Sequence, residues 1–83
     1  MYRYNDQVGL LVESVIPGSA ADNAGIRNGD LLIKIDDKQV EGYTDLTRVL
    51  LNHEVGDSIN VTIIRDGSEK TIKVILQEAT KVE

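Results

Sequence analysis

The sequence lacks several of the residues on which small proteins rely for covalent support and for chemistry. It has no cysteine, no tryptophan and no phenylalanine, and a single histidine and a single proline among its 83 residues. Without cysteine, neither a disulfide nor thiol chemistry is available. The core must therefore be built from Ile, Leu and Val, in one domain near the lower size limit for folding without covalent staples.

Positive charge and long apolar runs are also scarce. Nine basic residues against fourteen acidic ones give a net charge of −5. This balance argues against nucleic acid as a partner, because nucleic-acid binding needs a clustered positive face. No apolar run approaches the roughly 20 residues that span a bilayer, and we expect no membrane contact by this domain itself. No signal peptide is present, so an exported parent protein would contain this chain as an excised piece.

Residues that could carry catalysis are few. His53 is the only histidine, and it falls on an apolar helical stripe, which favours packing or groove lining over proton transfer. There is no Gly-x-Ser-x-Gly nucleophile elbow, and a zinc site needs three or four closely placed ligands. The pair Asp36–Asp37 lacks the remaining ligands of a calcium loop. The sequence therefore predicts no catalytic residue, no metal and no cofactor.

The first half of the chain predicts a strand, a short helix and a second strand. Residues Gly9–Ile16 are apolar and rich in β-branched side chains, and a Pro-Gly pair ends them. Ser19 is a suitable N-cap for a short helix over Ala20–Ala24. Gly25 lies where a left-handed residue would end that helix, and Leu31–Ile35 is expected to form the next strand.

The middle of the chain predicts a longer, amphipathic helix. After a short strand over Lys38–Val40, Thr44 would cap a helix that runs to His53, with Asp45 in its first turn. Its apolar residues recur at i, i+3, i+4 and i+7 and form one stripe. The stripe consists of Leu46, Val49, Leu50 and His53, and Leu51 widens it.

A β-hairpin is predicted near the C-terminus. Residues Ser58–Arg65 alternate between apolar and polar side chains. The dipeptide Asp66–Gly67 is a strong signal for a two-residue turn with positive φ at both positions. Residues Glu69–Leu76 would form the returning strand.

The order and spacing of these elements resemble a known family. The stretch PGSAADNAGIRNGDLLIKIDDKQV is similar to the middle of a PDZ domain, of the bacterial type attached to trypsin-like serine proteases of the HtrA/Deg family. The resemblance extends from about Val8 to Leu76. Each piece alone is a weak signal, whereas all of them in this order are a strong one.

The resemblance implies an α+β, PDZ-like fold. We expect a partly open antiparallel β-barrel or sandwich of five to six strands with two α-helices, in the permuted bacterial strand order. Residues 8–77 would form the PDZ-like domain, and residues 78–83 a polar tail. Residues 1–7 would form an N-terminal segment that is either a short edge strand or a half-ordered terminus.

The resemblance further implies a peptide-binding module without catalytic activity. In PDZ domains an extended peptide adds to a sheet edge beside the amphipathic helix, which is β-augmentation. The ligands would be extended, apolar C-terminal segments of substrate proteins, and a serine protease domain would lie in the same extracytoplasmic parent chain. The peptide-binding residues would be Tyr2, Arg3 and Tyr4 at the edge, with Leu46, Val49, Leu50 and His53 on the helix.

Other readings stay open. Residues Val8–Leu11 look like the carboxylate-binding loop of the family but come one strand too late. The loop would therefore precede Met1, or the domain lacks it. The chain would alternatively be the PDZ domain of a site-2 or carboxyl-terminal processing protease, or an assembly module without a peptide ligand.

Overall fold

The computed structural model describes residues 2–4 and 7–77, with side chains from Val8 onward. The described elements are β1 (Tyr2–Tyr4), β2 (Gln7–Leu11), α1 (Ala20–Ala24), β3 (Leu31–Ile35), β4 (Lys38–Gln39), α2 (Tyr43–Leu50), β5 (Ser58–Arg65) and β6 (Ser68–Ile75). The polar tail expected at residues 78–83 lies outside the described residues. No helix in the described part has the length and apolarity needed to cross a membrane.

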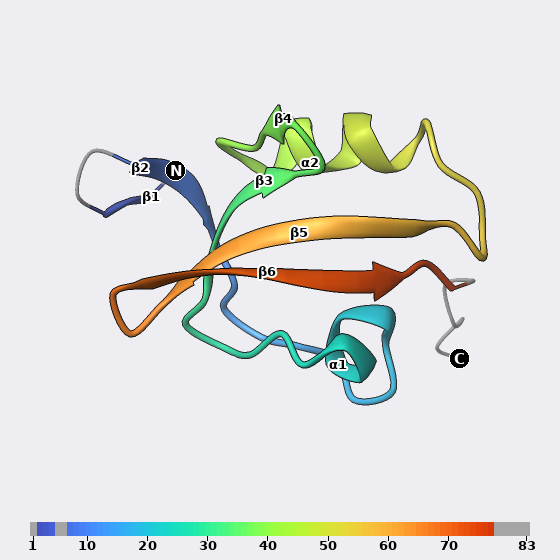
Figure 1. Cartoon of the computed structure of the whole chain (residues 1–83), viewed down its shortest axis with the longest axis horizontal. Helices are drawn as coiled ribbons and strands as arrows, with labels where there is room; N and C mark the ends of the chain where they lie inside the picture. Colours follow the sequence, from blue (N-terminus) through green and yellow to red (C-terminus); the bar gives the residue numbers. More distant parts are fainter. Residues whose placement is uncertain (1, 5–6, 78–83) are drawn as a thin grey trace.

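The strands form one antiparallel sheet in the order β1-β2-β3-β5-β6, and β4 pairs with β3 beside this path. Figure 1 shows the two long strands β5 and β6 side by side. In this view α1 lies below them, and α2 lies above them near β3 and β4. The β1–β2 hairpin projects at one end of the molecule. An open antiparallel sheet with two helices confirms the fold class predicted from the sequence.

Most of the buried apolar side chains form one main core. It is built almost entirely from Ile, Leu and Val, as the absence of Trp and Phe requires. Its buried members include Ile35 of β3 and Ile63 of β5, both 0% exposed, and Val49 of α2 at 5%. A second cluster of Leu31, Ile33 and Ile64 is buried apart from it. Strand β3 serves both clusters because alternate residues face opposite sides of the sheet. Its register shift between Leu32 and Lys34 places Ile35 in the same cluster as Leu32.

The first predicted strand is shorter than expected. Strand β2 ends at Leu11 rather than at Ile16, which is 70% exposed. Val12 still exchanges backbone hydrogen bonds, donating its N–H to the Asp30 carbonyl at 2.8 Å and accepting from Gly29 N–H at 2.7 Å. These partners belong to a loop, so the ladder stops there and the chain turns away toward α1.

Strand β2 changes partners at Gly9. Residues Gln7–Gly9 pair with β1, whereas Leu10 and Leu11 pair with β3. A Cβ atom at Gly9 would lie 2.6 Å from the Leu32 carbonyl oxygen, closer than real Cβ atoms come to backbone. Glycine is therefore required here by the close approach of two strands, a recognised use of glycine inside a strand.

The short helix and the final turn follow the sequence closely. Ser19 Oγ accepts a hydrogen bond from Asp22 N–H at 3.2 Å, and Gly25 ends α1 in the left-handed region with φ +94°. In the β5–β6 turn, Asp66 and Gly67 both have positive φ, +53° and +80°. Both the cap and the predicted two-residue hairpin are confirmed.

Helix α2 has different bounds from those expected. It starts at Tyr43 with Gly42 as its N-cap, so Thr44 is not the capping residue. The carboxylate of Asp45 instead accepts a hydrogen bond from Glu41 N–H at 3.0 Å, which fixes the chain entering the helix. The helix ends at Leu50, and His53 lies in the tight turns that follow it.

Candidate peptide-binding site

Strand β1 forms one end of the sheet. Its register with β2 pairs Tyr2 with Gly9, Arg3 with Val8 and Tyr4 with Gln7. Among the described strands it pairs only with β2. In an antiparallel ladder, successive residues direct their N–H and C=O groups alternately toward the partner and away from it. Strand β1, formed by Tyr2, Arg3 and Tyr4, therefore has backbone groups that point away from β2.

The inner face of α2 packs against the main core. Val49 is buried within that core, and Leu46 and Leu50 pack against it while half-buried. Leu10 of β2 packs against the same core. Strand β2 and helix α2 therefore border one apolar interior. Of the predicted pocket residues on the helix, Leu46 and Leu50 keep exposed surface that a ligand can touch, whereas Val49 keeps almost none.

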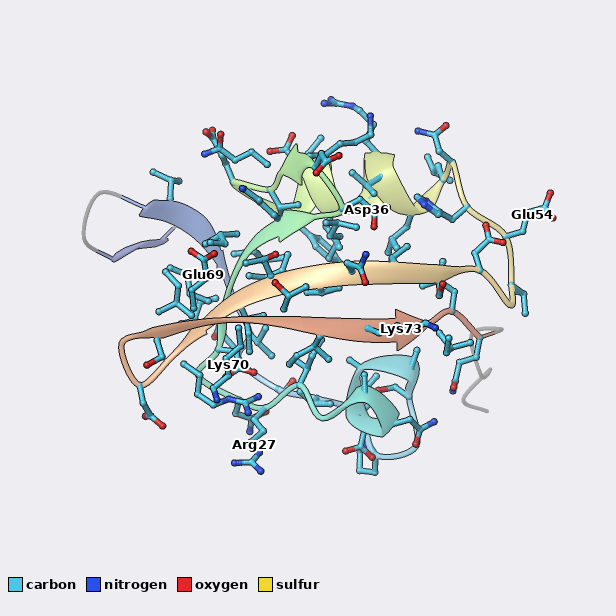
Figure 2. All side chains as sticks on the ribbon, viewed as in Figure 1. Arg27, Asp36, Glu54, Glu69, Lys70 and Lys73 are labelled. Carbon is cyan, nitrogen blue, oxygen red and sulfur yellow. The ribbon has the colours of Figure 1, made fainter. Side chains whose placement is uncertain are left out.

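His53 links the end of α2 to the turn between β3 and β4. Its Nδ1 lies 2.9 Å from the Val49 carbonyl oxygen, and its Nε2 lies 3.7 Å from Asp36 Oδ2. Asp36 has φ +53°, and its Oδ1 accepts a hydrogen bond from Asn60 N–H at 3.0 Å. Figure 2 labels Asp36 beside α2 at the end of β3. Both ring nitrogens of His53 therefore face protein groups.

The outer face of α2 carries a hollow that the sequence reasoning did not identify. The hollow is lined by Tyr43, Thr44, Thr47, Arg48 and Leu51. Tyr43 is 71% and Leu51 is 80% exposed, unusual for large apolar side chains. The signal in the sequence is the spacing of Tyr43, Thr47 and Leu51 at i, i+4 and i+8, a second stripe beside the inner one. We call these five residues the α2 hollow.

A second hollow, on the sheet, is polar. It is lined by Lys34, Asp36, Asp37, Asn60, Thr62, Glu69 and Thr71. No group of three His, Cys, Asp or Glu residues in the described part is placed to hold a metal ion.

Comparison with known proteins agrees with this geometry. The PDZ domain family matches residues 2–76 of the chain. The serine protease Do-like HtrA of Lactobacillus helveticus is 41% identical over 69 residues, which are 83% of this chain and 17% of that protein. A probable periplasmic serine protease of Haemophilus influenzae is 28% identical over 76 residues, 92% of this chain and 16% of that protein. The chain thus spans under a fifth of these relatives.

Solved structures share the fold. The HtrA-type protease AlgW with a decapeptide superposes with a TM-score of 0.79 at 17% identity, covering 87% of this chain and 22% of that one. The PDZ domain of HtrA3, bound to a phage-derived ligand, gives a TM-score of 0.74 at 19% identity, covering 82% and 59% of the two chains. With the family match over nearly its whole length, the chain belongs to the PDZ domain family, and its sequence relatives are HtrA-type serine proteases.

Proposed function

We propose that this domain binds extended, apolar C-terminal segments of other proteins by β-augmentation, without catalysing a reaction. The observation that carries the proposal is the position of β1 at the end of the sheet path, where no other described strand covers its outer edge. A peptide that pairs with β1 gains backbone hydrogen bonds that do not depend on its sequence. Its specificity then comes from the pockets that receive its side chains.

Helix α2 supplies the side-chain contacts in this proposal. Leu46 and Leu50 form the half-buried floor, and Tyr43, Thr47 and Leu51 form the outer wall. Val49 supports the floor from inside the core. His53 holds the end of the helix in position through its contacts with the Val49 carbonyl and with Asp36.

The relatives support a role in substrate recognition or regulation of a protease. The two relatives described above are serine proteases more than five times as long as the matched segment, so the catalytic domain would lie elsewhere in the same parent chain. One relative is named periplasmic, which supports an extracytoplasmic location. AlgW and the PDZ domain of HtrA3 were each solved with a peptide, which supports peptide as the class of ligand.

An NMR titration tests the proposal. The labelled domain is titrated with apolar peptides that end in a free carboxylate, and with the same peptides amidated. Shifts at Tyr2–Tyr4 and along α2 that are lost on amidation would establish a groove that reads a C-terminus. Equal shifts with both forms would mean binding along the strand without capture of the chain end. The absence of shifts with every peptide would overturn the proposal.

A second candidate function is assembly through the same surface without a peptide ligand. The observation that favours it is the exposure of Tyr43 and Leu51 on one face of α2. Size-exclusion chromatography at low and high protein concentration separates the two, because an assembly module self-associates and a peptide reader stays monomeric. The PDZ domain of a site-2 or carboxyl-terminal processing protease would bind peptides in a similar way, and residues preceding Met1 in the parent protein would distinguish it.

A further inference from the structure

Strand β6 forms the end of the sheet opposite to β1. Among the described strands it pairs only with β5, in one uninterrupted register. Leu76 directs both of its backbone groups toward that side, because its N–H donates to the Asp57 carbonyl and its carbonyl accepts from Gly56 N–H, both at 2.8 Å. Backbone direction alternates along an antiparallel strand. The N–H and C=O groups that point away from β5 are therefore those of Glu69, Thr71, Lys73 and Ile75.

Helix α1 contacts β6 but leaves space beside this edge. Lys73 and Ile75 line a hollow of about 180 Å³ with Gln77 and three residues of α1, which are Ala20, Asn23 and Ala24. We call these six residues the α1–β6 hollow. The side chains of all four outward-directed residues of β6 are exposed, and Ile75 is 51% exposed. The edge of β6 is therefore accessible to a second strand.

The edge of β6 carries one charge of each sign, placed evenly about Thr71. Glu69 lies two positions before Thr71 and Lys73 two positions after it, so their side chains share one face of the strand. Figure 2 shows Glu69 and Lys70 on opposite sides of β6, with Lys73 farther along the strand. Glu69 and Lys73 are separated by about 13 Å along the strand, and the ion pairs found among the described residues involve neither of them.

We propose that two copies of this domain pair through β6, antiparallel and about a twofold axis at Thr71. In this register Glu69 of each copy lies opposite Lys73 of the other, and the two Thr71 residues face each other. All three have backbone groups that point outward, so the strands can exchange hydrogen bonds along the edge. Opposite charges directly across an antiparallel pair stabilise it. A register centred on Glu69 or on Lys73 would instead set like charges opposite each other, so the charges favour the axis at Thr71.

The pairing has the form of a closed dimer. A twofold axis uses the same patch on both copies, so the interface does not extend to a third copy. Ile75 then lies opposite Gly67 of the second copy, which brings the β5–β6 turn of that copy beside the α1–β6 hollow. Strand β1 lies at the other end of the sheet path. The dimer therefore leaves the proposed peptide edge unoccupied, and the inference does not depend on peptide binding.

Sedimentation velocity from micromolar to millimolar protein measures the dimer, and an exchange of charges tests its register. Lys73→Glu sets two glutamates opposite each other at both ends of the pair and should weaken dimerisation by at least about tenfold. Glu69→Lys should do the same by opposing two lysines. Both substitutions in one chain restore opposite charges across the pair and should restore the dimer. Because Glu69 and Lys73 form no ion pair within the described part of one chain, such a rescue requires pairing between copies.

Two control variants separate this edge from other surfaces. Lys70→Glu changes the net charge as Lys73→Glu does, but its side chain lies on the other face of β6, so the dimer should persist. Leu51→Ser in the α2 hollow should leave the dimer unchanged as well. Loss of the dimer in Leu51→Ser would assign it to α2 and overturn the inference.

Two further results would overturn the inference and leave the proposed function standing. One is a domain that stays monomeric at millimolar concentration. The other is a double variant, Glu69→Lys with Lys73→Glu, that fails to restore the dimer lost in each single variant. The size-exclusion comparison described for assembly through α2 is best made with Lys73→Glu, because this variant removes association through β6.

Discussion

Arg65 binds the buried carboxylate of Asp30 through two hydrogen bonds, from Nε to Oδ1 at 2.8 Å and from Nη2 to Oδ2 at 2.7 Å. Asp30 is 1% exposed. Its Oδ2 also accepts from Arg27 N–H at 2.8 Å, and Arg65 Nη2 donates to the Gly25 carbonyl at 2.9 Å. The pair thus ties the end of β5 to both ends of the loop between α1 and β3.

The Asp30–Arg65 pair predicts a loss of stability in acid. The hydrogen bonds from Arg65 outweigh burial and hold the pKa of Asp30 below its usual range. A depressed folded-state pKa means that Asp30 stabilises the fold above its unfolded pKa of about 3.9, and that this stabilisation is lost as the pH falls through the folded value. We expect Asp30→Asn to lower the melting temperature by several degrees at pH 7, because an amide offers Arg65 only one acceptor. The gap between the unaltered domain and Asp30→Asn should narrow below pH 4.

Thermal melts from pH 7 to pH 2 measure this gap. Asp37→Asn, at an exposed position in the β3–β4 turn, is the control and should change the melting temperature little at any pH. A gap that stays constant down to pH 2 would contradict the role assigned to the Asp30 carboxylate.

Gly9→Ala should destabilise the domain by about 1–3 kcal/mol, because the added methyl group would overlap the Leu32 carbonyl oxygen. Urea denaturation measures the change. Gly42→Ser is the matched control, since Gly42 has extended backbone with φ −160° and open space around it. A serine there can cap α2, so this variant should be neutral or slightly stabilising. Equal stabilities of the two variants would show that the strands can move apart at Gly9.

Val49 of α2 and Leu51, the residue that ends this helix, should separate stability from binding. Val49→Ala removes buried core volume and should cost about 2 kcal/mol, measured by urea denaturation. Leu51→Ser changes an 80% exposed side chain and should leave stability within about 0.5 kcal/mol. On the proposed function it should weaken peptide binding on the order of fivefold. Unchanged affinity in Leu51→Ser, measured by anisotropy, would remove Leu51 from the proposed site.

The β5–β6 turn predicts a fourth stability effect. Gly67→Val should cost on the order of 1 kcal/mol or more, because a β-branched residue resists the φ of +80° observed there. Asp66→Asn should be tolerated, since asparagine accepts positive φ in such turns. A melting temperature unchanged in Gly67→Val would argue that the turn can adopt another conformation at no cost.

Short-range signals explain what could be predicted from the sequence. The Ser19 cap, the Gly25 terminus and the Asp66–Gly67 turn depend on neighbouring residues, so local chemistry decided them. The end of β2 at Leu11 depends on a distant loop that takes over the hydrogen bonds of Val12. No local pattern carries that information.

The candidate site was predicted less completely for a similar reason. The inner stripe of α2 was read from its periodicity, but the same periodicity does not say which members lie in the core. The burial of Val49 and the contact of His53 with Asp36 follow from elements far away in the sequence. The outer stripe went unnoticed at Tyr43 because threonine and arginine interrupt it. Leu51 was assigned to the inner stripe, but it is 80% exposed and lies with Tyr43 in the α2 hollow.

Because β2 changes its partner at Gly9, the two halves of this strand pair with different neighbours. Residues before Gly9 hold β1, and residues after it hold β3 and the core. On the proposed function, a ligand that pairs with β1 therefore contacts the strand held by the first half of β2 only. The second half keeps its pairing with β3, against which Gly9 allows the backbone of β2 to pack closely.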